Sequence, residues 1–273
     1  MLSSERFSPV SSVVENNIVH FIGAGPGDVE LITVKGARLL READVVVYAG
    51  SLVDRELVRT YAPDAAVYDS AAMTLEETTQ VLAQAVADGK RAVRLHTGDP
   101  SIYGAIQEQM AELDRLGIAY AVVPGVTSAF AAAATLKQEL TLPEVSQTVI
   151  ITRLAGRTPV PERESLAGIA KIGATLVIYL SVSMIERVVA ELLQGAYTPA
   201  TPAAVVARAS WPDEEVVEGT LADIATKVKE AGIGKQALIL VGDVLRARRE
   251  GVKAKSLLYD REFSHEFRKG VIT

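Results

Sequence analysis

Residues 18–28 read IVHFIGAGPGD, an apolar run followed at once by a glycine-rich loop. β-branched and aromatic residues are typical of strands, and glycine adopts backbone conformations that other residues avoid. The stretch therefore predicts a strand over 19–22 that ends in a tight turn, with Pro26 fixing its geometry. Such a turn either serves the fold alone or lets a bulky ligand approach the backbone closely.

The loop at 23–28 resembles a dinucleotide-binding fingerprint only in part. That fingerprint requires a small residue where Asp28 stands, because a carboxylate there would repel a pyrophosphate. It also requires an acidic residue at the end of the second strand, where this chain has Ala49 and Gly50. The sequence therefore argues against a nicotinamide-dependent oxidoreductase.

Outward from this loop, β-branched runs alternate with helical patterns. We predict strands over 44–48, 92–95 and 119–123, and helices over 33–43, 75–88 and 102–116. Strands separated by helices pair in parallel and are buried on both faces. We therefore expect an α/β domain over 18–141, preceded by a flexible polar lead-in over 1–17 that does not read as a secretory signal.

A break at 142–144, reading LPE, predicts the boundary of a second α/β domain over 142–245. Its strands are expected over 147–152, 175–180, 204–208, 215–219 and 237–241. Helices are expected near 164–170, at a capping box formed by Ser183 and Glu186, and after Thr220 and Asp223. The turn at Trp211 and Pro212 predicts an antiparallel section.

Composition narrows the class of protein. The 273 residues are 49% hydrophobic and 23% charged, which is enough for a sizeable core. The apolar runs fall short of the ~20 residues of a membrane span, so we expect no membrane partner. The absence of cysteine excludes disulfides, thiolate metal sites and a cysteine nucleophile; it favours the cytoplasm, and we expect no metal. A net charge of −6 argues against nucleic acid as the main partner.

The tail over 246–273 has the opposite charge balance. It holds eight Lys or Arg residues against four Asp or Glu. Two interpretations stay open: a solvated appendage, or a segment that folds over the substrate or a partner subunit.

Two further loops follow predicted strands. Residues 97–100 read TGDP, in which Asp99 either caps the next helix or binds a ligand. Residues 124–128 read PGVTS, and either hydroxyl residue can cap a helix or bond a ligand. Open α/β sheets hold ligands at the carboxyl ends of their strands. The three loops together therefore predict one crevice.

In combination these motifs resemble the tetrapyrrole methylase family, over about residues 18–245. The stretches that carry the resemblance are 23–28, 98–100, 124–128, 201–208 and 237–242. The resemblance implies a class III methyltransferase with two α/β domains, S-adenosyl-L-methionine in the trough between them, and a homodimeric assembly.

Further marks are similar to the branch of this family that acts on precorrin-4. They are His96 and Thr97, the run 103–105 (YGA), the loop 153–161 (RLAGRTPVP), residues 210–214 (SWPDE) and the stretch 259–268. They imply methyl transfer to C-11 of precorrin-4, giving precorrin-5 and S-adenosyl-L-homocysteine, in cobalamin biosynthesis. Taken alone, His96 is also compatible with a satisfied structural histidine.

The resemblance also implies site residues. Cofactor contacts carry over to Pro26, Thr97, Gly98, Asp99, Ile102, Thr127, Ser128, Leu180, Ala209 and Ala237. A carboxylate such as Asp99 can hold amino or hydroxyl groups of the cofactor. Substrate contacts are assigned to Tyr103, from the pattern of the loop after Asp99, and to Arg153 and Arg157. Guanidinium groups match the acetate and propionate groups of a precorrin. The alternative is that both arginines are simply solvated.

No catalytic base is assigned. Some members of the family have an aspartate near the end of the second strand, where this chain reads AGS over 49–51. Two rival functions remain at this stage: a relative that methylates RNA ribose or a protein side chain, and a binding module without activity.

Overall fold

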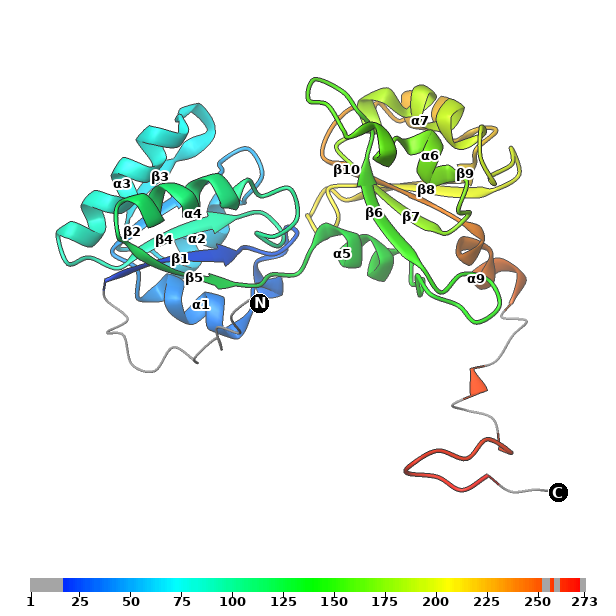
Figure 1. Cartoon of the computed structure of the whole chain (residues 1–273), viewed down its shortest axis with the longest axis horizontal. Coiled ribbons are helices and arrows are strands. Elements are labelled where there is room, and N and C mark those ends of the chain that lie inside the picture. The colour runs from blue at the N-terminus through cyan, green and yellow to red at the C-terminus, as the bar shows by residue number, and fades with distance from the viewer. Residues whose placement is uncertain (1–16, 252–255, 258–260, 271–273) are drawn as a thin grey trace, which may run out of the picture. The chain divides into compact units, whose positions relative to one another are not determined.

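The structure, a computed structural model, describes residues 17–251, 256–257 and 261–270 (Figure 1). Nearly all of the predicted lead-in and part of the basic tail lie outside these residues. The chain divides into two compact units between Thr127 and Ser128. Within the described ranges, each helix is too short or too polar to cross a membrane.

The first unit contains a parallel sheet in the order β3-β2-β4-β1-β5. Its strands are β1 (Ile18–Gly23), β2 (Val45–Tyr48), β3 (Ala66–Asp69), β4 (Ala92–His96) and β5 (Ala119–Val123). The four predicted strands are confirmed. β3 was not predicted, because it is a short exposed edge strand without a buried apolar residue. The expectation that all strands are buried was wrong for β5, since it forms the other edge.

Helices cover both faces of this sheet (Figure 1). They are α1 (Val34–Arg41), α2 (Arg55–Tyr61), α3 (Leu75–Ala87) and α4 (Ile106–Arg115). Leu40 and Leu57, from α1 and α2, join one core, whereas Leu82 and Leu113, from α3 and α4, join the other. Short 3-10 turns lie at Val29–Leu31 and Ser70–Ala72.

Helix α4 begins later than the predicted start at residue 102. Tyr103 and Ala105 have φ angles of 54° and 48°, in the left-handed region. A right-handed helix cannot include such residues, so the helix starts at Ile106. The residues in between form a loop at the carboxyl edge of the sheet.

The second unit contains a mixed sheet in the order β6-β7-β10-β8-β9. Its strands are β6 (Val149–Arg153), β7 (Thr175–Tyr179), β8 (Pro202–Ala207), β9 (Glu215–Thr220) and β10 (Ala237–Val241). β6 and β7 pair in parallel, whereas β10 is antiparallel to β7 and β8. The predicted antiparallel section is confirmed by the pairing of β8 with β9.

The second unit also contains helices. They are α5 (Ser128–Thr135), α6 (Leu166–Ala170), α7 (Ile185–Leu192), α8 (Ile224–Glu230) and α9 (Ala247–Glu250), with 3-10 turns at Glu162–Glu164, Val182–Met184 and Asp243–Arg246. Helices α6, α7 and α8 pack on one core. Helix α5 packs on the other, which contains Val177, Val206 and Leu240 of the sheet.

The boundary between the two units lies before α5, and not after it as predicted. The residues of α5 lie within the range predicted for the first domain, which ends at the predicted boundary near Leu142. Ala129 and Ala132 are nearly inaccessible because they pack on the second sheet. Alanine side chains allow this close approach, so the helix joins the second unit and the division falls at Thr127.

Of the two helix starts predicted from capping residues in the second unit, one is wrong and one is confirmed. The capping box predicted from Ser183 and Glu186 is wrong, because α7 follows a 3-10 turn and has Met184 at its N-cap without a side-chain bond. Asp223 does begin α8, and its carboxylate accepts a 2.7 Å hydrogen bond from the Thr220 nitrogen.

Candidate functional site

The three glycine loops of the first unit lie side by side because β1 is between β4 and β5. Backbone hydrogen bonds join the first two loops: Ala24 N donates to His96 O at 2.7 Å, and Gly98 N donates to Gly25 O at 2.8 Å. The predicted convergence at the carboxyl edge of this sheet is therefore confirmed.

Glycine is required where the loops touch. A Cβ atom on Gly23 would lie 2.5 Å from the carbonyl oxygen of Gly98 and 2.6 Å from the Cα of Gly125. A Cβ atom on Gly125 would lie 2.1 Å from the same carbonyl oxygen. These neighbours are backbone atoms, which cannot move aside as a flexible side chain can. The contact leaves main-chain groups of three strands grouped at one edge.

Asp99 connects two of these loops. Its Oδ2 accepts a 2.9 Å hydrogen bond from Gly125 N, and its Oδ1 accepts bonds from the Ser101 nitrogen and hydroxyl. Burial raises the pKa of Asp99, but the hydrogen bonds from Ser101 and Gly125 outweigh it and hold the pKa below its usual value. Asp99 is not the cap of α4, which begins at Ile106. Its ionised carboxylate instead fixes the spacing of the loops.

The loop between β4 and α4 is strained. Tyr103 and Ala105 are left-handed, and a Cβ atom on Gly104 would lie 2.1 Å from the Pro100 oxygen. Left-handed residues other than glycine cost roughly 1–2 kcal/mol each and gather at functional sites. Tyr103, the predicted substrate contact, is 46% exposed at this position.

The second unit has its own cluster of left-handed residues, which sequence reasoning missed. Leu180, Arg208, Ser210 and Gln236 have φ angles of 53°, 49°, 67° and 51°. None is glycine, so the sequence carries no direct signal of this geometry.

Strand register places these residues at one edge of the second sheet. Ile239 lies opposite Ile178 in the antiparallel pair β7 and β10, which puts Leu180 level with Ala237. Ala237 is also opposite Ala207, and Arg208 N donates a 2.8 Å hydrogen bond to Gln236 O. The left-handed residues thus lie at or next to Leu180, Ala209 and Ala237, three of the four positions in this unit that are expected to contact a cofactor.

Leu180 is unusual within that cluster. Its side chain is 66% exposed, although its backbone is in a conformation that leucine avoids. Ala129 N, in the first turn of α5, donates a 3.1 Å hydrogen bond to the hydroxyl of Tyr179. This bond brings the start of α5, with Ser128, to the same edge as Leu180.

The ten predicted cofactor residues therefore form two groups. The first unit holds Pro26, Thr97, Gly98, Asp99, Ile102 and Thr127, with Pro26, Gly98 and Thr127 buried. The second holds Ser128, Leu180, Ala209 and Ala237. Each group is collected at one edge of its own sheet, and the contacts of both with a cofactor stay predictions.

The two predicted substrate arginines differ. Arg153 donates from Nη1 to Thr158 O at 3.2 Å and from Nη2 to Pro159 O at 2.6 Å. Arg187 binds the same loop through Ala155 O at 2.8 Å. Arg153 thus braces the loop from within, whereas Arg157 is exposed at its tip.

His96 is a buried neutral residue. Burial, and then the nearby charge of Arg94, lower the pKa of His96 to about 3. Its ring stacks on Phe21 at 5.9 Å between centroids, and its Nε2 has no hydrogen-bond partner within the described residues. The burial of His96 therefore agrees with a structural role. However, the residue is not the fully hydrogen-bonded histidine that this interpretation predicts.

Asp69 is a further residue near the candidate site that the sequence did not predict. Its Oδ1 accepts hydrogen bonds from Ala71 N at 2.9 Å and from Gly50 N at 3.0 Å. These bonds, Ala71 first, hold the pKa of Asp69 below its usual value. A carboxylate thus reaches the loop after β2, from the end of the unpredicted strand β3. Within the described ranges, His, Asp and Glu residues form no cluster suited to a metal.

Comparison with known proteins adds to this geometry. Residues 18–225 match the family described as Tetrapyrrole (Corrin/Porphyrin) Methylases. A Methanocaldococcus jannaschii protein named cobalt-precorrin-4 C(11)-methyltransferase is 58% identical over 254 residues, covering 93% of this chain and 97% of its own.

Two solved structures are also similar. A cobalt precorrin-4 methyltransferase has a TM-score of 0.83 and 46% identity, covering 87% of this chain and 99% of its own. A Thermus thermophilus uroporphyrin-III C-methyl transferase, solved with S-adenosyl homocysteine, has a TM-score of 0.71 and 32% identity, covering 84% and 99%. With these matches and its three glycine loops, the chain belongs to the tetrapyrrole (corrin/porphyrin) methylase family.

Proposed function

We propose that the chain transfers a methyl group from S-adenosyl-L-methionine to C-11 of precorrin-4, giving precorrin-5 and S-adenosyl-L-homocysteine in cobalamin biosynthesis. The observation that carries this proposal is the 58% identity, over 93% of the chain, to a protein named for methylation at that carbon. The likeness in fold to a precorrin-4 methyltransferase supports it.

The residues of the first unit suit this cofactor, which contains a nucleoside and an amino acid but no phosphate. The loop after β1 leads into a short 3-10 turn whose N-cap is Asp28, and the carboxylate of Asp28 accepts a bond from Glu30 N at 2.8 Å. An acid at that position disfavours a phosphate. Grouped main-chain donors and acceptors beside Gly98 and Gly125 suit neutral polar groups instead.

The second unit offers an apolar surface at the edge of its own sheet. Leu180 supplies an exposed apolar side chain beside Ala237, which suits the flat face of an adenine ring. The strain in its backbone is consistent with a position held for binding rather than for stability. We assign the cofactor contacts of this unit to Ser128, Leu180, Ala209 and Ala237.

Alignment of the reactants is the main task of the protein in this mechanism. The bound cofactor supplies an electrophilic methyl group on its sulfonium sulfur, and the neutral thioether S-adenosyl-L-homocysteine is the leaving group. The chain's residues hold the two reactants in line, and such orientation is worth up to ~7–11 kcal/mol. Asp99 acts here as a positioning residue, because it fixes the loops through Gly125 and Ser101. We assign no general base.

The substrate contacts are assigned to Tyr103 and Arg157. Both are exposed, and Arg157 lies at the tip of a loop held by Arg153 and Arg187. Precorrin-4 carries carboxylates on its rim, which a guanidinium recognises well. Arg153 supports this contact indirectly, since its own donors are directed at Thr158 and Pro159.

Kinetics of Arg157→Ala test this contact. We expect a higher KM for precorrin-4, unchanged affinity for S-adenosyl-L-homocysteine, and a defect that shrinks as salt is added. Arg163→Ala is the matched control, because Arg163 is an exposed arginine near the same loop. Parent-like kinetics of Arg157→Ala at low ionic strength would place the carboxylate contact elsewhere, with the basic tail after Leu245 the next segment to test.

Product analysis tests the reaction itself. The purified protein is incubated with isotopically labelled S-adenosyl-L-methionine and with precorrin-4, with or without cobalt, or uroporphyrinogen III. We expect one added methyl group at C-11 by mass spectrometry and carbon NMR, and no turnover of uroporphyrinogen III. Methylation of uroporphyrinogen III, or of RNA in a parallel assay, would reject the proposal. The two forms of precorrin-4 decide whether the natural substrate contains cobalt.

Assembly and location complete the proposal. We propose a homodimer in the cytoplasm, on the resemblance of the chain to its family and on its lack of cysteine. Light scattering during size-exclusion chromatography measures the oligomeric state, with a mass near twice 29.1 kDa expected. Fractionation of cells that express the tagged chain tests the cytoplasmic location. A monomeric mass or a membrane-bound pool would contradict the respective part.

A further inference from the structure

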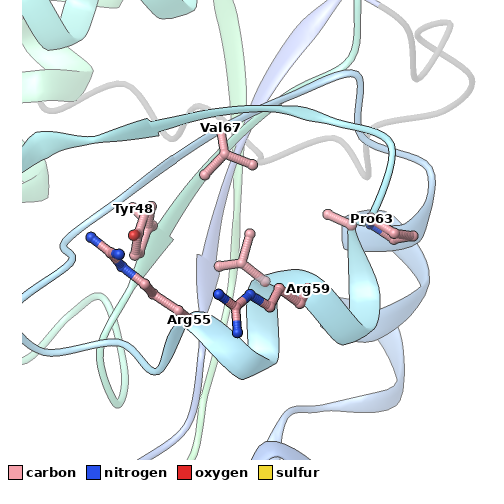
Figure 2. Close-up of a pocket in the computed structure, with 7 residues that line it drawn as sticks. Tyr48, Arg55, Arg59, Pro63 and Val67 are labelled. Carbon is pink, nitrogen blue, oxygen red and sulfur yellow. The ribbon is translucent and has the colours of Figure 1, made fainter.

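A cavity of about 370 Å³ opens in the first unit beside helix α2 (Figure 2), and its lining residues include none from the glycine loops. Its lining residues come from β2, α2 and β3, and from the turn after α2: Tyr48, Arg55, Val58, Arg59, Ala62, Pro63 and Val67. At ~30 Å³ per water molecule, the space corresponds to roughly a dozen waters. It suits a compound with a body of one or two rings.

The inner surface of the cavity is apolar. Tyr48, Val58 and Ala62 are 4%, 5% and 3% exposed and form its floor. Val67 belongs to the short edge strand β3 and is 45% exposed, so this side of the floor is open. An apolar floor of this kind favours a flat hydrophobic body over a strongly hydrated one.

The rim of the cavity is positively charged. Arg55 and Arg59 are four residues apart on α2, so their side chains leave the same face of the helix. Figure 2 shows the side chain of Arg55 reaching toward Tyr48 and that of Arg59 drawn in front of α2. The residues that line the cavity include no carboxylate.

The guanidinium groups keep donors for a ligand. The ion pair of Arg55 with Asp69 is 3.9 Å long and that of Arg59 with Glu56 is 3.8 Å, both beyond hydrogen-bonding distance. The two arginine side chains are 69% and 74% exposed. A carboxylate at the rim can therefore form charged hydrogen bonds without breaking stronger ones inside the protein.

We propose that this cavity is a second ligand site, which binds a small aromatic carboxylate. The ring lies on the floor made by Tyr48, Val58 and Ala62, and the carboxylate is held by Arg55 and Arg59. The site goes beyond the proposed methyl transfer and does not depend on it, because none of its residues belongs to the glycine loops.

Titration of the full-length protein with 2-naphthoate tests the site. The methyl NMR signals of Val58, Ala62 and Val67 should shift in a saturable way. The neutral analogue 2-naphthamide should bind about tenfold more weakly or worse, since it cannot form charged hydrogen bonds with the arginines. Added salt should weaken the acid more than the amide.

Variants assign the charge to named residues. Arg55→Gln and Arg59→Gln should each weaken 2-naphthoate about tenfold, with the affinity for S-adenosyl-L-homocysteine unchanged. Arg115→Gln is the matched control: its side chain is 68% exposed, in an ion pair on α4. It should bind 2-naphthoate as the parent does.

Three results would overturn the proposal. They are no saturable shift at the three methyl-bearing residues, equal affinity for the acid and the amide, and an equal loss of binding in Arg115→Gln. The comparison of acid with amide uses the unmodified chain, so it decides the question even if a variant folds poorly.

Discussion

The main-chain nitrogen of Gly125 lies 2.9 Å from a carboxylate oxygen of Asp99, and this hydrogen bond joins loops that are 26 residues apart in the sequence. Asp99→Ala should weaken S-adenosyl-L-homocysteine binding by ~1.5–3 kcal/mol, because a charged hydrogen bond that orders the site is lost. Isothermal titration calorimetry measures this change. Asp114→Ala is the control, since Asp114 accepts a bond from Tyr120 on the outside of α4. Unchanged affinity in a folded Asp99→Ala protein would refute the role.

Gly125→Ala tests the contact between the loops. The new Cβ would lie 2.1 Å from the Gly98 oxygen, so the loops must separate. We expect cofactor binding to become undetectable and the free energy of unfolding to fall by more than ~2 kcal/mol, a loss typical of backbone clashes. Gly234→Ala is the control, because its Cβ meets nothing within 4 Å. Thermal unfolding of both variants should show a lower Tm only for Gly125→Ala.

Leu180→Asn separates stability from binding. Asparagine tolerates the left-handed region better than leucine, so the free energy of unfolding should rise by ~0.5–1 kcal/mol. Affinity for S-adenosyl-L-homocysteine should fall, because the exposed apolar wall beside Ala237 is lost. Lys137→Asn is the matched control, since Lys137 is also left-handed, with φ 51°. It should gain stability with no change in binding, and an equal loss of affinity in both variants would contradict the assignment.

His96 predicts a dependence of stability on pH. Its pKa is about 3 in the folded chain and ~6.5 when unfolded, so between these values the unfolded state binds more protons. Stability should therefore fall as pH drops below ~6.5, by up to ~1.4 kcal/mol per pH unit from this residue. Urea unfolding from about pH 7 to about pH 5 should show a shallower slope for His96→Gln. His265→Gln, at a half-buried histidine, is the control variant.

Much of the fold was predictable because local patterns agree with it. The run from Val19 to Ile22 is apolar except for His20 and is a central strand, with its loop at the carboxyl edge as expected. The strand β3 could not be predicted, since all four of its residues are exposed. The boundary near Leu142 was misplaced because a Pro-containing break is a local signal. The packing of α5 depends instead on distant residues such as Leu240.

The positions of the three glycine loops were predictable from the sequence, whereas the contacts between their residues were not. The glycines at 23, 98 and 125 mark the loops, but only strand order brings them into contact. Asp99 followed a capping pattern, and its bond to Gly125 depends on a register that no local motif specifies. The left-handed backbone of Leu180 carries no sequence signal at all. Arg153 was identified by its charge, whereas its carbonyl partners fix it within the loop.

The strand order of the first sheet also constrains how this protein is made. β1 leaves the ribosome before both of its neighbours, because β4 and β5 end only at His96 and Val123. Bringing β1 together with strands so far along the chain slows folding. A nascent chain that stops before Ala92 leaves both edges of β1 unpaired. The glycine loops can meet only after residue 125 has emerged. Truncation before that point should give chains that aggregate through β1 rather than a smaller folded unit.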